Sequence, residues 1–332
     1  MRSLVWCGWL LLGSLMMAIT SAGPAAAAAP AAAAAAAPAT SASPAATALG
    51  PAPGLSATLH SELTRSEAFS RHPVRFLIVG DSIALTLGLS LTKHDPGAYG
   101  VQIFNHAVLG CDLDPTMEIL TSGTVGPATP GCADWPGLWP SLTRAVHPQV
   151  VALGVGRWEV SDHLYEGRWV HIGQAVWDTH VADDLRQAIS IFRGCGAKVV
   201  LFTMPYIDPS DRQPNGLPWS ENTEARTRVF NALVERVAHA DPGEVTVINL
   251  NKMLSPRGVY TRSIDGIDVR WSDGIHVTEA AGTLLKGQIL PVVDRLGLEA
   301  VASAGSGSGS RAGSGSRAGS GSRAGSGSGT SR

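Results

Sequence analysis

A serine stands directly after the first strand-like run of the chain, where a nucleophile can be placed at the beginning of a helix. The apolar run Val74–Val79 leads straight into Gly80, Asp81 and Ser82. A helix that begins at this serine offers free N–H groups and a dipole, which favour the negative charge formed when a hydroxyl attacks a carbonyl. The plainer alternative is that Asp81 or Ser82 only caps the helix, as short polar residues often do. The tripeptide alone leaves both interpretations open.

A histidine with an aspartate three residues before it stands toward the other end of the central part. Asp273 and His276 come just before the last predicted helix, Thr278–Leu290. An aspartate at this spacing can accept the imidazole Nδ1–H and fix the tautomer, which leaves Nε2 free to take a proton from a serine. A turn aspartate beside an ordinary surface histidine is the plainer alternative. Together with Ser82, the pair predicts serine–histidine–aspartate chemistry if the fold brings the two ends together.

Strand-like and helix-like runs alternate between these residues, and the alternation predicts how the two ends meet. Helical spacing of apolar residues occurs in Ile172–Phe192 and Glu221–Ala240, whereas Ser82–Leu91 fits either element by pattern and is assigned to a helix by its position. Strand and helix in alternation predict a parallel sheet with helices on both faces, and ligands bind at the carboxyl ends of its strands. Five short runs rich in Val and Ile are the predicted strands: Val74–Val79, Val101–Phe104, Val150–Val155, Lys198–Met204 and Val245–Asn249.

The two motifs together resemble the first and last blocks of the SGNH (GDSL-like) hydrolase superfamily. The resemblance rests on Gly80–Ser82 after the first strand and on the Asp-x-x-His that ends at His276, and it covers Val74–Leu290. The greatest similarity is to the exported SGNH domain linked to membrane acyltransferases that O-acetylate cell-envelope sugars. It implies an α/β fold: a three-layer α/β/α sandwich around a central, mainly parallel five-stranded sheet of flavodoxin-like type.

The same resemblance implies a role for each residue of the site. Ser82 is expected to be the nucleophile, His276 the base and Asp273 the residue that orients it. Gly110 lies in a segment similar to the second block of the superfamily, whose glycine N–H contributes to the oxyanion hole. The N–H groups of Ser82 and Gly110 are therefore the expected oxyanion donors.

The third block departs from the superfamily pattern, in which an asparagine amide is a further oxyanion donor. Here the third strand run is followed by Gly-Arg-Trp-Glu, without asparagine. Loss of such a donor costs about two to three orders of magnitude in turnover unless another group replaces it. The Arg157 guanidinium could replace it, or Arg157 could pair with Glu159 or another acid and only hold the loop. Trp158 and Asn105 are candidate substrate contacts, although Asn105 could equally terminate the second strand.

The interpretation of the cysteines assumes that the protein is exported. Cys111 and Cys132 bracket a loop rich in Gly, Pro and Thr and are predicted to form a disulfide. Cys195 is left over and is expected to be a buried free thiol. No spacing resembles a zinc site, and we expect neither a metal nor another cofactor. Three histidines are judged to share no helical face with carboxylates at ligand spacing: His163, His171 and His180.

The two ends of this 332-residue chain differ in composition from its middle. Residues 1–22 combine a charged start, an apolar stretch and small residues, which predicts a signal peptide or an uncleaved signal anchor. Residues 23–58 form an Ala/Pro-rich linker, 59–300 the catalytic domain and 301–332 a disordered Gly/Ser/Arg tail. Outside these ends the chain is acidic, which disfavours nucleic acid as a partner. No interior apolar run reaches the ~20 residues that span a bilayer, so only an uncleaved N-terminal segment is expected to contact a membrane.

These patterns lead to one predicted function and one alternative. The prediction is a secreted or extracytoplasmic serine esterase that removes, or transfers, O-acyl groups, chiefly O-acetyl, on cell-envelope carbohydrate or another small ester through an acyl-serine. Transfer would need a separate membrane protein as acyl donor. The alternative is a catalytically degenerate SGNH-fold protein that binds envelope carbohydrate. The missing asparagine motivates this alternative, and the intact Ser82, Asp273 and His276 argue against it.

Overall fold

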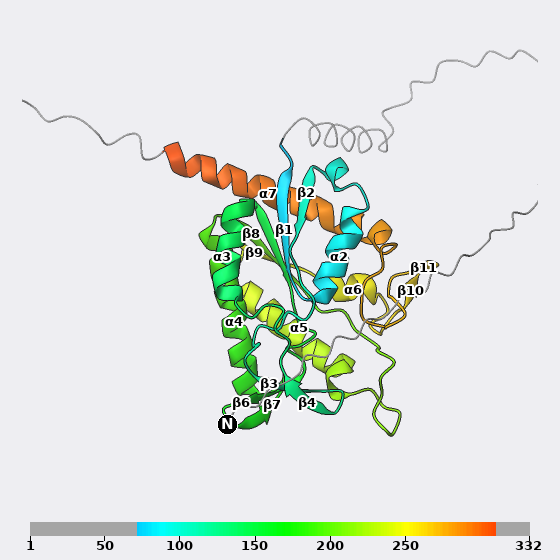
Figure 1. The fold of residues 1–332 in the computed structure, drawn as a ribbon. Coiled ribbons are helices and arrows are strands. Elements are labelled where there is room, and N and C mark those ends of the chain that lie inside the picture. Colours follow the sequence, from blue (N-terminus) through cyan, green and yellow to red (C-terminus); the bar gives the residue numbers. More distant parts are fainter. Residues whose placement is uncertain (1–71, 310–332) are drawn as a thin grey trace, which may run out of the picture. The chain divides into compact units, whose positions relative to one another are not determined.

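A parallel sheet of five strands forms the centre of residues 72–309, the part of the chain that the computed structural model describes (Figure 1). Every residue of its third and fourth strands is buried, which explains why these strands read as continuous apolar runs rather than as alternating ones. The predicted fold class and the five predicted strands are confirmed. The strands lie in the order β2-β1-β5-β8-β9: β1 (Val74–Gly80), β2 (Val101–Asn105), β5 (Val150–Gly154), β8 (Lys198–Phe202) and β9 (Val245–Ile248).

Helices cover both faces of this sheet. The first of them, α2, packs against β1 and α7, whereas α3, α4 and α5 pack on one another in series, with α4 against β8 and α5 against β9. The helix assigned after Ser82 is therefore confirmed, and Figure 1 shows α2 on the opposite side of the sheet from α3 and α4. The long helices are α2 (Ser82–Thr92), α3 (Trp135–Val146), α4 (Ala175–Gly194), α5 (Glu224–His239) and α7 (Gly282–Gly309).

The direction of winding reverses at the first strand. The chain passes from β1 to β2 on one side and then returns to β5 on the other side, so β1 lies between β2 and β5. The register pairs Ile78 with Asn105 and Gly80 with Gly154, which brings the carboxyl ends of all three strands together. Such a reversal point is where α/β sheets of this kind bind their ligands.

A second, antiparallel sheet and a small hairpin were not predicted. Their two-residue turns all have a Gly as the second residue and positive φ angles at both positions, the geometry of type I′ turns: Ser122-Gly123, Glu166-Gly167 and Asp265-Gly266. The second sheet has the order β4-β3-β6-β7: β3 (Glu118–Thr121), β4 (Thr124–Pro127), β6 (Asp162–Tyr165) and β7 (Arg168–Val170). The hairpin joins β10 (Ser263–Ile264) to β11 (Ile267–Asp268), and short helical turns are η1 (Pro96–Tyr99), η2 (Ser220–Asn222) and α6 (Leu250–Leu254).

The last helix is longer than expected. It was predicted over Thr278–Leu290, but α7 begins at Gly282 and continues through Pro291 to Gly309. A proline inside a helix removes one N–H donor, and the buried side chains of Leu290 and Val293 on either side keep the helix packed on the core. Helix α7 therefore extends beyond residue 300, where the catalytic domain was expected to end.

Two further expectations concern the periphery. Cys195 follows α4 and is an exposed free cysteine, so the expectation of a buried thiol was wrong. The predicted signal segment, the predicted linker and residues 310–332 of the predicted tail lie outside the described residues. Within residues 72–309, no helix is both long and apolar enough to span a bilayer.

Candidate active site

The turn from β1 into α2 places Ser82 at the first position of a helix. Gly80 has a φ of 127°, and a Cβ there would lie 1.9 Å from the Gly154 carbonyl oxygen, so only glycine fits. The Asp81 N–H donates to that same carbonyl at 2.8 Å. The Asp81 Oδ1 accepts from the N–H groups of Ile83 and Ala84 at 2.8 and 3.2 Å. Asp81 is therefore the helix cap, and the hydroxyl of Ser82 is not needed for capping.

The second block lies against this turn. The N–H groups of His106 and Val108 donate to the carbonyls of Ile78 and Gly80 at 2.8 and 2.9 Å, so the chain after β2 runs alongside the end of β1. Gly110 follows, with a φ of 66°. Its carbonyl accepts from the Thr129 hydroxyl at 2.7 Å, which holds the peptide in place.

Two main-chain donors at this edge are free. Within residues 72–309, neither the Ser82 N–H nor the Gly110 N–H has a hydrogen-bond acceptor. The disulfide between Cys111 and Cys132, which confirms the predicted pairing, fixes the chain directly after Gly110. Free N–H groups at a helix start and on an adjacent rigid loop are what an oxyanion hole requires.

The histidine is held by its aspartate in the expected way. Asp273 Oδ2 lies 2.6 Å from His276 Nδ1, and Oδ1 accepts from the N–H groups of Ile275 and His276 at 2.8 and 3.1 Å. Partial burial raises the pKa of Asp273, but the hydrogen bonds from the His276 ring and from the two amides outweigh this and hold the pKa below its usual range. An ionised Asp273 accepts the Nδ1 proton, so the lone pair of a neutral His276 is on Nε2.

The base lies beside the first turns of α2. The N–H of Val277 donates to the Thr86 hydroxyl at 3.2 Å, and Thr86 is one helical turn after Ser82. His276 Nε2 is buried and has no hydrogen-bond partner within the described residues, so it makes no hydrogen bond to Ser82 in this structure. Catalytic hydrogen bonds are often long without substrate and tighten when it binds. Thr86 was missed by sequence reasoning, although its spacing of four from Ser82 puts it on the same helical face.

Asp81 is an unusual acid in this site. It is 2% exposed, and its Oδ2 accepts from the Arg157 N–H at 3.3 Å. Burial raises the pKa of Asp81 to about 6, against the opposing influence of its three amide hydrogen bonds and of the charge of His276. Sequence reasoning treated Asp81 only as a cap.

Arg157, which the resemblance suggests as a substitute for the asparagine of the third block, is buried at 8% exposure. Burial lowers the pKa of its guanidinium, and the charges of Glu221 and Asp81 oppose this effect. Its Nη1 is buried without an acceptor within the described residues. Within the described residues, no ion pair joins Arg157 to Glu159. The alternative that Arg157 only holds the loop by pairing with Glu159 therefore finds no support. The guanidinium carbon instead lies 5.2 Å from the centre of the Trp158 ring.

The remaining candidate contacts have structural roles in this structure. Trp158 is half-buried under the Arg157 guanidinium. The Asn105 amide donates to the Leu85 carbonyl on α2 at 2.9 Å, and a Cβ at Gly88 would lie 2.5 Å from the Asn105 side chain. The structure therefore brings Ser82, Gly110 and Arg157 to one edge of the sheet and the His276 segment against α2, whereas Asn105 is turned toward that helix.

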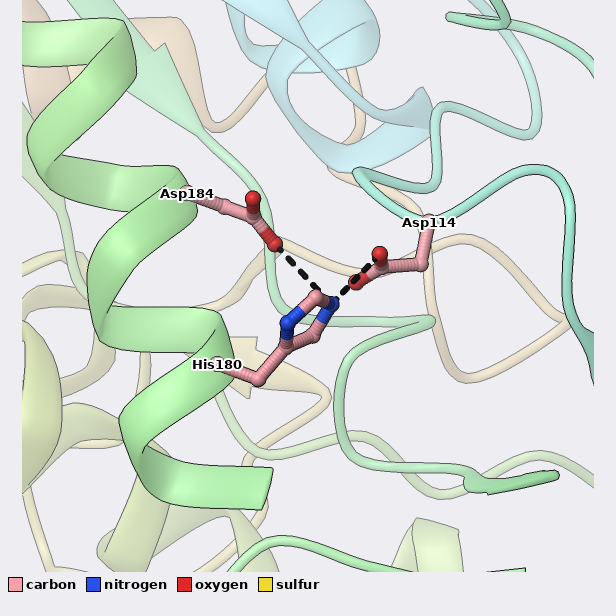
Figure 2. Close-up of side chains that lie close together, drawn as sticks. All are labelled: Asp114, His180 and Asp184. Atoms are coloured by element: carbon pink, nitrogen blue, oxygen red, sulfur yellow. Dashed lines mark hydrogen bonds and ion pairs between the residues drawn. The ribbon is translucent and has the colours of Figure 1, made fainter. Parts of the chain in front are cut away.

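One group of side chains within residues 72–309 has the composition of a metal site, namely Asp114, His180 and Asp184 (Figure 2). The expectation that His180 shares no helical face with a carboxylate was wrong, because Asp184 stands four residues further along α4. Asp114 comes from a segment 66 residues earlier in the chain, which no local pattern relates to His180. None of the three belongs to the serine, histidine and aspartate arrangement described above.

Several solved structures are similar to this chain at low identity. A psychrotrophic esterase from Pseudoalteromonas sp. matches at 12% identity over 65% of this chain and 93% of that chain, with a TM-score of 0.39. A GDSL-like lipase from Bacteroides thetaiotaomicron matches at 16% identity over 71% and 97% of the two chains, with a TM-score of 0.40. An acetylxylan esterase from Geobacillus stearothermophilus matches at 15% over 66% and 94%, with a TM-score of 0.38. The fold and the site are defined by the sheet order and side-chain geometry of this chain.

The family comparison covers the body of the molecule. No curated protein sequence matches the chain. One family matches residues 75–292, which run from the first strand of the central sheet into the last helix and include Ser82, Gly110, Arg157, Asp273 and His276. This match extends over more than half of the 332 residues. The chain therefore belongs to the family described as Protein of unknown function (DUF459).

Proposed function

We propose that this protein is a serine esterase that cleaves O-acyl esters through an acyl-serine intermediate. The Ser82 hydroxyl oxygen attacks the acyl carbonyl while its proton passes to His276 Nε2, and Asp273 stabilises the imidazolium that forms. The Ser82 and Gly110 N–H groups donate to the oxyanion of the tetrahedral intermediate. His276 then returns the proton to the departing alkoxide, which leaves as the alcohol. Water attacks the acyl-serine by the same route and releases the carboxylic acid.

The observation that carries this proposal is the state of the histidine. His276 has its Nδ1 held 2.6 Å from Asp273 Oδ2 and its Nε2 buried without a partner. A buried ring nitrogen without a hydrogen-bond partner is costly and calls for an explanation, and a role as proton acceptor supplies one. The segment that carries it packs on α2, one turn from Ser82, whose hydroxyl is the group that such a base requires.

We further propose an extracytoplasmic location and O-acetyl groups of cell-envelope carbohydrate as the substrate. The location is supported by the signal-like N-terminus and by the disulfide of the loop after Gly110. The substrate class is supported by the sequence resemblance to envelope acetyltransferase-linked domains. Trp271, two residues before Asp273, is 53% exposed and donates its indole N–H to the Val277 carbonyl at 3.1 Å, and an exposed indole held in this way is suited to stacking on a sugar. A membrane acyl-donor protein would be required only if a sugar hydroxyl replaces water as acceptor.

The test is the release of p-nitrophenol from its acetate ester by the full chain. Ser82→Ala and His276→Ala should each reduce turnover to the rate of the uncatalysed reaction, and a fluorophosphonate probe should label the wild type but not Ser82→Ala. Ser141→Ala on α3 and His239→Ala on α5 are matched controls, because both side chains are exposed and distant in sequence from the site. Equal rates in all five proteins without labelling would refute the esterase and leave carbohydrate binding as the function to test next.

A further inference from the structure

A second polar cluster joins the disulfide-closed loop to α4. Asp114 lies in the loop between Cys111 and Cys132, while His180 and Asp184 lie one turn apart on α4. His180 Nε2 is 2.7 Å from Asp114 Oδ1 and 3.6 Å from Asp184 Oδ2. Figure 2 shows both carboxylates directed at the same ring nitrogen. A single imidazole nitrogen thus faces two acids.

The two carboxylates have more acceptor atoms than donors. Asp114 is 8% exposed, and its Oδ2 is buried without a hydrogen-bond partner. Asp184 Oδ2 is also buried without a hydrogen-bond partner within the described residues. One Nε2 proton can satisfy only one of the two carboxylates, and within residues 72–309 no lysine or arginine forms an ion pair with either. Two partly buried carboxylates at close range repel each other, and a dication between them would offset this repulsion.

The geometry fits a small divalent cation in place of the missing donor. The three ligand atoms, one from each side chain, lie within 4.8 Å of one another. In a tetrahedral site with ligands at about 2.0–2.2 Å, neighbouring ligand atoms are roughly 3.3–3.6 Å apart, so rotation of the two carboxylates around the fixed imidazole would be needed to reach that spacing. One imidazole nitrogen with two carboxylate oxygens suits Zn²⁺ better than Mg²⁺ or Ca²⁺, which prefer oxygen alone.

We propose that Asp114, His180 and Asp184 form a binding site for a transition-metal dication of the Zn²⁺ type, with water completing the coordination. The orientation of the imidazole is already fixed, because the Tyr165 and Trp177 rings lie 4.8 and 5.2 Å from the His180 ring. Such fixed surroundings of a ligating histidine strengthen metal binding.

The bound ion would act as a second clamp on the loop between Cys111 and Cys132, which begins directly after Gly110. The disulfide closes this loop on itself, whereas a metal bound to Asp114 would attach it to α4. The ion would hence stabilise the folded protein. The inference does not depend on esterase activity, because none of the three ligands belongs to the catalytic arrangement.

The test is the titration of Zn²⁺ into the untagged, chelator-treated full chain by calorimetry, together with thermal unfolding. One Zn²⁺ per chain is expected, with a rise in Tm of about 5–10 °C when free Zn²⁺ is a hundred times Kd. Asp184→Asn should raise Kd for Zn²⁺ by at least about a hundredfold, because it removes a direct metal ligand. Loss of a group that only hydrogen-bonds to a ligand already costs about 10–100-fold in metal affinity. Asp183→Asn is the matched control: it removes the same charge from the neighbouring position, which pairs with Arg186, and should leave Kd unchanged.

Three outcomes would overturn the proposal. The first is a wild-type chain that binds no Zn²⁺, and the second is an unchanged Kd in Asp184→Asn. The third is equal weakening by Asp184→Asn and Asp183→Asn, which would mean general charge attraction rather than coordination. Asp114→Asn replaces Asp184→Asn if the latter does not fold, as judged by circular dichroism. Mg²⁺ is the comparison ion, and it should bind at least tenfold more weakly than Zn²⁺.

Discussion

Replacement of Asp81 by asparagine is expected to stabilise the folded protein at alkaline pH, although it removes a charge from a helix cap. Burial raises the pKa of Asp81 to about 6, whereas the ordinary value is 3.8. Between these two values the folded chain keeps the proton and the unfolded chain loses it. The free energy of unfolding therefore falls as pH rises from about 4 to about 6, and stays lowered above that. A difference of this size corresponds to about 3 kcal/mol at pH 8.

The asparagine variant avoids this cost and keeps most of the cap. Its side-chain oxygen can accept from the Ile83 and Ala84 N–H groups, as Oδ1 of Asp81 does. Its amide nitrogen cannot accept from the Arg157 N–H, and loss of that bond costs about 1–2 kcal/mol. The net gain at pH 8 is therefore about 1–2 kcal/mol. At pH 4.5 wild-type Asp81 costs only about 1 kcal/mol, so the variant gains nothing there.

Urea unfolding of the full chain at pH 4.5 and pH 8 measures this difference. The free energy of Asp81→Asn relative to wild type should become more favourable by about 2 kcal/mol between the two pH values. Asp134→Asn is the matched control, because Asp134 also precedes a helix but is exposed and makes no capping hydrogen bond. It should show no such change. A relative stability of Asp81→Asn that is the same at both pH values would refute the argument that burial governs this carboxyl.

Three further predictions concern the site. Asp273→Asn should lower kcat for p-nitrophenyl acetate by about 10³–10⁴-fold with little change in stability, because it alters the tautomer and orientation of His276. Arg157→Ala should lower kcat by about 10²–10³-fold and leave KM within a fewfold of the wild-type value, as steady-state kinetics would show. An increase in KM with unchanged kcat would contradict an oxyanion role. Cys132→Ser should lower the free energy of unfolding by about 3 kcal/mol, because it opens the loop after Gly110, and urea unfolding with and without reductant measures this.

The central sheet could be predicted because its strands are buried on both faces. Continuous Val and Ile runs such as β5 and β8 carry that signal in a few adjacent residues. The strands of the smaller sheet carry a weaker sequence signal. Its turns do contain Ser122-Gly123 and Glu166-Gly167, but the strands beside them are three or four residues long and mostly half-exposed. Short strands of this kind are defined by their pairing partners rather than by their own pattern.

The residues of the site also differ in how far the sequence could predict their surroundings. Asp273 and His276 are three residues apart, so their hydrogen bond could be expected from spacing alone. The environment of Asp81 could not, because its altered pKa comes from burial by segments remote in sequence. Asp114 and His180 are a clearer case, since the cluster exists only after the loop has packed on α4. Sequence patterns thus report local geometry, whereas burial and long-range contacts require the fold.

The oxyanion role predicted for Arg157 would explain why a buried guanidinium stands at this position. A buried guanidinium without a full set of acceptors costs stability, and the charges of Glu221 and Asp81 offset that cost only in part, because the pKa of Arg157 stays below its usual range. Packing alone would be served better by an apolar side chain at this position. An oxyanion formed at Ser82 would supply the negative charge that the guanidinium lacks, and the interaction would be strongest in the transition state. A loss of kcat in Arg157→Ala would therefore support the prediction that this guanidinium takes the place of the asparagine amide expected from the resemblance, and an unchanged kcat would contradict it.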